Sequence, residues 1–201
     1  MGRPWLEFIE NLVIGVTLIG WSLRHFWQLP ESAGAVEYSA LTLNVVAGVL
    51  LLIRTRAAQQ GSWQKWAWAF PCILMGAVVF SLAPPSIDWS VLPQIVFVLG
   101  TGLTIVSLLS LGRSFSIFPA RRGVVTYGPY AWVRHPAYLG ECLMAVGCLV
   151  ACPTISMVLV LFVLPLFVVW RIHQEEDLME ADAKYVDYRQ RVRWRLIPGV
   201  W

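Results

Sequence analysis

Long apolar runs separated by short polar loops are the main pattern of this 201-residue sequence. Runs of roughly 20 apolar residues can cross about 30 Å of hydrocarbon as helices. The pattern predicts six such segments, at residues 8–27, 36–53, 66–83, 91–111, 136–152 and 154–173. The predicted fold is therefore all-α: a polytopic helical membrane protein with about six transmembrane segments, the last two forming a tight hairpin. The fifth segment, with roughly 17 residues, is at the lower limit for a span.

The last two segments are separated by a break at Pro153, with His135 eighteen residues before it and Arg171 eighteen residues after it. If both arms are helices, each polar end lies about 27 Å from the turn at a rise of 1.5 Å per residue. The hairpin therefore returns two polar clusters to the same level. These are Arg134, His135 and Tyr138 on one arm, and Arg171, Glu175 and Glu176 on the other.

Composition supports a membrane protein with one domain. The chain is 58% hydrophobic and 13% charged, whereas soluble domains carry about 25% charged residues. We expect a single membrane domain over 1–201, with four helices in 1–111 and the candidate site in 112–201. The four cysteines lie in or at the ends of apolar segments without metal-ligand spacing, so no metal site is predicted.

The distribution of basic residues predicts the orientation. In a six-segment arrangement almost every Lys and Arg flanks the segments on one side, and only Arg24 falls on the other. Positive flanks stay in the cytoplasm, which places both termini and the polar cluster there. The same sorting explains the net charge of +3 without a nucleic-acid partner.

The polar C-terminal region carries an apolar stripe at spacings of three and four, typical of an amphipathic helix. The stripe consists of Leu178, Ala181, Tyr185, Tyr188 and Val192. We expect one cytoplasmic helix, either along the membrane surface or folded back over the site. The closing WRLIPGVW is interpreted as an interfacial tail docked on the membrane.

The start of the fifth segment favours an anionic ligand. Pro136 suits the first helical position, so His135 takes the non-helical position before it. The unpaired N–H groups of such a helix start can hold a carboxylate beside Arg134 and His135. The alternatives are a membrane-flanking anchor for Arg134 and a helix cap for His135.

At the end of the sixth segment, Arg171 and Glu175 are four residues apart and share one face, while Glu176 points about 100° away. A simple surface ion pair is one interpretation of Arg171 and Glu175. The other is a functional site, in which two carboxylates facing different directions perform two tasks.

Three motifs in this region occur together. They are G-P-Y-x-x-x-R-H-P-x-Y-x-G from Gly128, R-x-x-x-E-E from Arg171, and Y-x-x-Y-x-x-x-V from Tyr185. In this combination and spacing, the sequence resembles the integral-membrane methyltransferases of the isoprenylcysteine carboxyl methyltransferase and phospholipid methyltransferase group. The first four segments match that group only in being apolar.

The resemblance implies methyl transfer from S-adenosylmethionine to a lipophilic acceptor, with 112–201 as the cofactor-binding and catalytic region. It implies that Arg171 and Glu175 lie at the acceptor end as catalytic residues. The cofactor residues it implies are Val125, Gly128, Tyr130, Arg134, His135, Tyr138, Leu139 and Glu176.

The acceptor itself stays open at this level. An arginine suits a prenylcysteine carboxylate or a lipid phosphate, but it could equally orient Glu175 as a base for an amine or a thiol. Two other functions remain as alternatives, a membrane sterol-reductase-like NADPH oxidoreductase and a non-catalytic membrane scaffold. A carboxylate facing the cofactor favours the methyltransferase, because it attracts a sulfonium and repels a dinucleotide phosphate.

Overall fold

The computed structural model describes residues 4–54, 59–60, 83, 85–115, 120–121 and 123–201. Helices dominate these ranges, which confirms the all-α part of the predicted fold class. The long helices are α1 (Pro4–Phe26), α2 (Ala35–Ile53), α4 (Val91–Leu111), α5 (Pro136–Ala151) and α6 (Ile155–Met179). A shorter helix, α7 (Ala183–Arg191), follows them. The predicted segment at 66–83 lies, except for its last residue, outside the described residues.

Short elements connect the helices. Three 3₁₀ turns are described, η1 (Ser86–Asp88), η2 (Gly112–Ser114) and η3 (Gly128–Ala131). Strands β1 (Gln59–Gln60) and β2 (Ala120–Arg121) form a two-residue antiparallel ladder, in which Gln59 pairs with Arg121. The sequence did not predict this ladder, because two residues are too few to show an alternating pattern.

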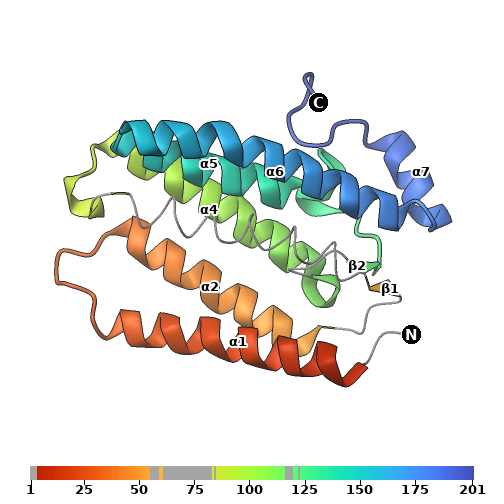
Figure 1. The fold of residues 1–201 in the computed structure, drawn as a ribbon, viewed down its shortest axis with the longest axis horizontal. Coiled ribbons are helices and arrows are strands. Elements are labelled where there is room, and N and C mark those ends of the chain that lie inside the picture. Colours follow the sequence, from red (N-terminus) through yellow and green to blue (C-terminus); the bar gives the residue numbers. More distant parts are fainter. Residues whose placement is uncertain (1–3, 55–58, 61–82, 84, 116–119, 122) are drawn as a thin grey trace.

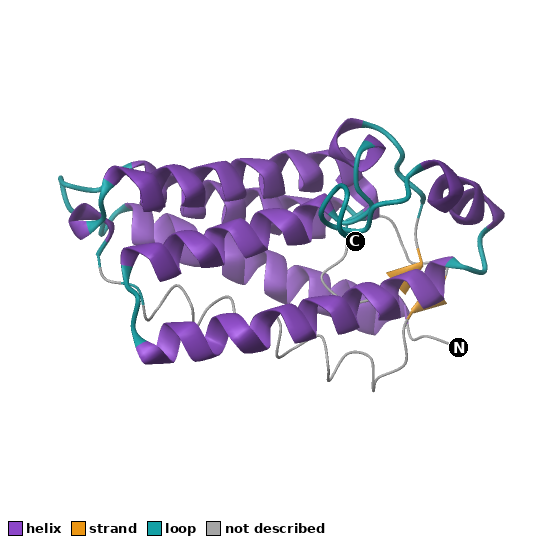
Figure 2. Ribbon diagram, turned by 90° about the horizontal axis from the view of Figure 1, so that it is seen from above, coloured by secondary structure: helices purple, strands orange, loops and turns teal. Residues whose placement is uncertain are grey.

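The long helices run side by side in two groups (Figure 1). Helices α1 and α2 form one antiparallel pair, and α4, α5 and α6 form the other group. Helix α7 and the β1–β2 ladder lie at the end of the bundle where α1 begins. Figure 2 shows the same gathering of short elements at one end of the long helices.

Glycines allow the helix backbones to approach each other closely. A Cβ atom at Gly140 of α5 would lie 2.6 Å from the carbonyl oxygen of Gly100 in α4 and 2.2 Å from the Thr104 hydroxyl. Between α1 and α2, a Cβ at Gly15 would lie 2.9 Å from the Gly48 carbonyl oxygen. Small residues at such crossings are typical of helices packed in membranes, where van der Waals contact is a main attraction.

Three described helices are long and apolar enough to cross a membrane. They cover Ala35–Ile53, Val91–Ser114 and Ile155–Met179. The apolar helix α5 is shorter, at 16 residues. The number of crossings in the whole chain therefore stays a prediction.

The single C-terminal helix expected from the apolar stripe is wrong in its boundaries. Helix α6 continues past the predicted end at 173 to Met179, and α7 starts separately at Ala183. Asp182 separates them as the N-cap of α7, because its carboxylate accepts a hydrogen bond from the Lys184 N–H at 3.0 Å. Such a cap satisfies an N–H that a helix start leaves unpaired, and so favours a new helix here.

Candidate functional site

The segment before α5 has the local geometry that the sequence predicts. Pro136 is the first residue of α5, and His135 precedes it with a non-helical backbone (φ −128°, ψ 58°). Upstream, Gly128 has φ +61°, a backbone conformation that residues other than glycine rarely adopt. The backbone conformations at Gly128 and His135 therefore set the positions of Tyr130, Arg134 and His135 at the end of the bundle.

The two polar clusters meet, as the spacing around Pro153 predicts. The Arg134 Nε donates to Glu176 Oε1 at 2.8 Å, and His135 Nε2 lies 3.2 Å from the same oxygen. The Tyr138 hydroxyl donates to Glu175. The start of α5 and the end of α6 therefore form one site.

Glu176 is the centre of the buried charges in this site. Its side chain is almost inaccessible, and its second oxygen accepts a hydrogen bond from Arg195 Nε at 2.9 Å. Two guanidinium groups and an imidazole thus share one carboxylate. The anionic group held beside Arg134 and His135 in this structure is therefore the chain's own Glu176.

Arg134 also holds the C-terminal segment. Its Nη1 donates to the carbonyl oxygens of Val192 and Arg193, both at 3.0 Å, and only 6% of the residue is exposed. Backbone bonds continue the contact, because the Arg134 and His135 N–H groups donate to the carbonyls of Trp194 and Arg195. Arg134 is therefore a buried clamp, and the anchor interpretation for it is wrong.

A second group of interactions surrounds Arg171. Its guanidinium lies over the ring of Tyr138, with 5.0 Å between Cζ and the ring centroid. Its Nε is 3.5 Å from Glu175 Oε1, and the Glu175 side chain is about one quarter exposed. The pair is thus held by an aromatic face and a phenol, unlike a simple surface ion pair.

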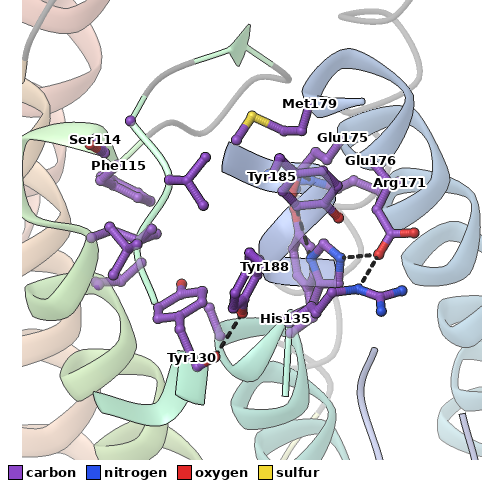
Figure 3. A pocket seen from close by; sticks show the side chains of 18 of the residues that line it. Ser114, Phe115, Tyr130, His135, Arg171, Glu175, Glu176, Met179, Tyr185 and Tyr188 are labelled. Atoms are coloured by element: carbon purple, nitrogen blue, oxygen red, sulfur yellow. Dashed lines mark hydrogen bonds and ion pairs between the residues drawn. The ribbon is translucent and has the colours of Figure 1, made fainter. Parts of the chain in front are cut away.

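Three tyrosines from η3 and α7 also line the site, and Tyr185 lies beside the charged groups (Figure 3): they are Tyr130, Tyr185 and Tyr188. The Tyr188 hydroxyl donates to the Tyr130 carbonyl oxygen at 2.7 Å, which fixes α7 over η3. Helix α7 therefore folds back over the site, one of the two positions expected for it. The hydroxyl of Tyr185 is buried and has no hydrogen-bond partner in the described part of the chain. Burial, and then the charge of Glu176, raises the pKa of Tyr185 above its usual range, so the phenol stays a hydrogen-bond donor.

A cavity lies between these groups and the end of α4. Eight of the ten predicted site residues line it: Val125, Tyr130, Arg134, His135, Tyr138, Arg171, Glu175 and Glu176. Gly128 and Leu139 do not. Gly128 shapes the turn into η3, and Leu139 packs against the apolar core.

The cavity also has lining residues that the sequence did not assign to it. They include Glu141 in α5 and Met179, Tyr185 and Tyr188 at the end of α6 and in α7. Tyr185 and Tyr188 belong to the third of the three motifs, but the apolar stripe that contains them indicated only the packing of a helix. Glu141 could have been identified from the sequence. A carboxylate inside an apolar segment is costly to bury, so such a residue is by default a candidate functional residue.

The fold and the cavity define a helical membrane protein with a charged site where two helix ends and the C-terminal segment meet. Residues 93–181 match the model of the isoprenylcysteine carboxyl methyltransferase family. The predicted resemblance is therefore confirmed, and the matched stretch contains both arms of the hairpin.

Similar known proteins include a yeast enzyme and a eukaryotic protein of solved structure. The chain is 33% identical over 122 residues to the protein-S-isoprenylcysteine O-methyltransferase of Saccharomyces cerevisiae, an alignment that covers 57% of this chain. It covers 51% of the yeast protein, so the chain spans about half the length of that relative. The structure of a eukaryotic intramembrane Ras methyltransferase, isoprenylcysteine carboxyl methyltransferase, superposes with a TM-score of 0.51 at 19% identity, covering 94% of this chain and 73% of that one. At this identity the likeness shows a shared fold.

Proposed function

We propose that this protein transfers a methyl group from S-adenosylmethionine to a lipophilic acceptor at the cytoplasmic face of the membrane. One observation carries the proposal: the R-H-P segment and the R-x-x-x-E-E segment border one cavity, inside the stretch that matches the methyltransferase family. The name of the yeast relative suggests a prenylcysteine as the acceptor, and other lipids are compatible with an apolar approach from the membrane.

The residues present fit the proposed cofactor. Tyr185 offers a buried hydroxyl that has no hydrogen-bond partner among the described residues, a donor that a polar ligand would satisfy. The rings of His135 and Tyr138 stack with 5.8 Å between centroids, and aromatic faces attract cations such as a sulfonium. When bound, the cofactor supplies an activated methyl group that is transferred by in-line displacement.

Glu176 has a positioning role in this proposal. Because two arginines and His135 already engage its oxygens, its charge is compensated within the protein. Its carboxylate fixes the imidazole and docks the C-terminal segment beside the start of α5. Exclusion of water and alignment of the reactants supply much of the rate in such displacements.

Arg171 and Glu175 are proposed as the acceptor end. The Tyr138 hydroxyl and the Arg171 Nε both address one oxygen of Glu175, so the direction of this carboxylate is fixed. The guanidinium lies over the Tyr138 ring while its Nε faces Glu175. An ammonium cannot make both contacts with the same geometry.

The first test separates methyl transfer from the alternatives. Purified protein should bind S-adenosylhomocysteine and not NADPH in isothermal titration. The variants Arg171→Lys and Glu175→Gln should lose at least tenfold in turnover with a prenylcysteine acceptor and keep their affinity for S-adenosylhomocysteine. Arg189→Lys and Glu180→Gln, which alter an exposed ion pair between α7 and the end of α6, are the matched controls. Unchanged turnover in the two site variants would remove their catalytic role, and binding of NADPH alone would favour the reductase.

The orientation rests on the sorting of basic residues, since Arg54, Arg113, Arg134 and Arg171 all lie near the end of the bundle that carries the site. Cysteines at the exposed positions Ser32 and Lys184 test it. An impermeant maleimide should label Ser32→Cys on intact cells and Lys184→Cys only after permeabilisation. The unsubstituted chain, with its native cysteines, is the control. The reverse labelling pattern is incompatible with a cytoplasmic site.

A further inference from the structure

The end of α7 and the segment after it carry more positive charge than the protein neutralises. From Tyr188 to Trp201 the sequence contains four arginines and no acidic residue. The first and the last of these arginines pair with carboxylates at the end of α6. The middle two, Arg191 and Arg193, are exposed, and neither makes an ion pair within the described part of the chain. Two guanidinium groups are therefore available to an external anion.

The segment ends in an ordered turn. The N–H groups of residues 195–197 donate to one acceptor, the Trp201 carbonyl oxygen, at 3.0, 3.0 and 3.2 Å. The Arg195 guanidinium lies over the Trp201 ring, with 5.2 Å between Cζ and the ring centroid. Leu196 is buried in the apolar core, and Trp201 packs against the same core. The turn therefore has a fixed shape and a fixed place on the bundle.

This ordered turn exposes apolar side chains. Ile197 and Val200 in the turn are exposed, and so is Trp194 just before it. Trp132 is exposed in the segment before α5, and the Arg134 N–H joins that segment to the Trp194 carbonyl. The C-terminal segment lies at the same end of the bundle as α7 (Figure 1). Exposed aromatic side chains at the end of a membrane-spanning bundle are typical of the lipid headgroup region.

Apolar side chains beside unneutralised arginines fit an anionic bilayer surface. The apolar groups enter the interface, while Arg191 and Arg193 can reach lipid phosphates and carboxylates. A basic side chain at such a surface strengthens binding by about fivefold, so two of them strengthen it by about twenty-five-fold. A neutral bilayer offers the apolar contact without the countercharge.

The same segment forms part of the candidate site. Its carbonyl groups at Val192 and Arg193 bind Arg134, and Arg195 binds Glu176. A ligand that binds the docked segment more tightly than the detached one shifts the equilibrium toward docking. The docked segment presents its turn already ordered and beside the chain that carries Trp132. A detached segment loses that neighbour and has to become ordered when it binds.

We propose that Arg191, Arg193 and Trp132, together with the apolar turn at 194–200, form a docking surface for anionic lipid, and that lipid bound there stabilises the clamp around Arg134. The assignment rests on the proposed function for the orientation of the site toward the cytoplasmic leaflet, which carries anionic lipids. The membrane thus regulates the site by its headgroup charge.

Hydrogen exchange in nanodiscs of two compositions tests the surface. One contains phosphatidylcholine alone, and the other also contains about 30% phosphatidylserine. In wild type the Arg134 and His135 amides should exchange at least fivefold more slowly in the anionic nanodiscs. The double variant Arg191→Gln, Arg193→Gln keeps the backbone carbonyls and should reduce this ratio below about twofold. The corresponding double lysine variant should retain the wild-type ratio, because the surface requires charge.

Exposed residues at the opposite end of the bundle supply the controls. Arg24→Gln, in the last turn of α1, should leave the exchange ratio unchanged. Trp132→Ala should lower the ratio, whereas Trp27→Ala should not, although Trp132 and Trp27 are similarly exposed at 77% and 83%. Equal or faster exchange of wild type in anionic nanodiscs overturns the docking surface. A wild-type ratio in the double glutamine variant overturns it as well.

Titration of both nanodisc preparations with S-adenosylhomocysteine separates this proposal from the proposed function. Binding of S-adenosylhomocysteine together with exchange that ignores lipid charge overturns the docking surface and leaves the proposed function standing. If S-adenosylhomocysteine binds in neither preparation, the proposed function fails. The exchange ratios still decide on the surface in that case, because they measure docking of the segment without any cofactor.

Discussion

Replacing Glu176 with glutamine tests whether the buried charge cluster docks the C-terminal segment. The carboxylate accepts from Arg134 and His135 with one oxygen and from Arg195 with the other. A glutamine offers one acceptor oxygen only. Its NH₂ group then faces a guanidinium, so a donor meets a donor, and the buried Arg134 loses its countercharge.

The expected size of the effect follows from the burial of the pair. Glu176 and Arg134 are 3% and 6% exposed, and removing one partner of a buried ion pair costs about 3–5 kcal/mol. Arg134 keeps its two bonds to the carbonyls of Val192 and Arg193, so we expect about 3 kcal/mol. At about 1.4 kcal/mol per factor of ten, the open state of the segment should become roughly a hundredfold more populated.

Hydrogen exchange at two amides measures this opening. The N–H groups of Arg134 and His135 donate to the carbonyls of Trp194 and Arg195 at 2.9 and 2.8 Å. Their hydrogens therefore exchange with solvent only when the C-terminal segment detaches from the start of α5. Exchange there should accelerate about a hundredfold in Glu176→Gln. Glu180→Gln, which removes an ion pair whose partners are about half exposed, should change it less than fivefold, the equivalent of about 1 kcal/mol. Equal exchange in wild type and Glu176→Gln would refute the clamp.

Two further predictions concern packing and the cofactor. Gly140→Ala should destabilise the protein by about 1–3 kcal/mol, seen as a lower thermal inactivation temperature, because the new methyl group would overlap Thr104 and the Gly100 backbone. The control is Gly102→Ala, on the same helix as Gly100 but with open space around it, which should be neutral or stabilising by up to about 1 kcal/mol. Equal losses of stability in the Gly140 and Gly102 variants would contradict the close approach of α4 and α5. Tyr185→Phe removes the unpartnered hydroxyl and should weaken S-adenosylhomocysteine binding about fivefold to tenfold, the equivalent of about 1 kcal/mol for a lost hydrogen bond. Titration with unchanged affinity would show that this hydroxyl does not contact the cofactor.

The sequence was most informative where one physical requirement dominates. Helix α4 spans Val91–Leu111, the range expected from its apolar run, because Ser90 and Gly112 limit the run on both sides. The meeting of the His135 and Arg171 regions followed from their equal separation in sequence from Pro153. Both inferences need only helix rise and hydropathy, which depend little on tertiary contacts.

The contacts that the sequence did not predict are made by groups that cannot be recognised from the residue type. Arg134 is held by two backbone carbonyls of the C-terminal segment, and any residue supplies a carbonyl. That both oxygens of Glu176 would be engaged could not be read from the E-E pair, because Arg195 reaches the second oxygen only when the C-terminal segment docks. The boundary between α6 and α7 at Asp182 could have been predicted, because aspartate is a common N-cap. The apolar stripe, which continues across Asp182, favoured a single helix instead.

The clamp around Arg134 has a consequence for the order in which the chain is made. Its partners lie 42, 58 and 59 residues downstream, at Glu176, Val192 and Arg193. During synthesis the R-H-P segment therefore leaves the ribosome well before the groups that neutralise it, and the α5–α6 hairpin can insert while the site is still incomplete. A nascent chain stopped before Val192 contains the described long helices α1, α2, α4, α5 and α6 and still lacks both carbonyl groups that Arg134 binds. Defects in the last ten residues should thus release the Arg134 clamp and leave the packing of the long helices intact.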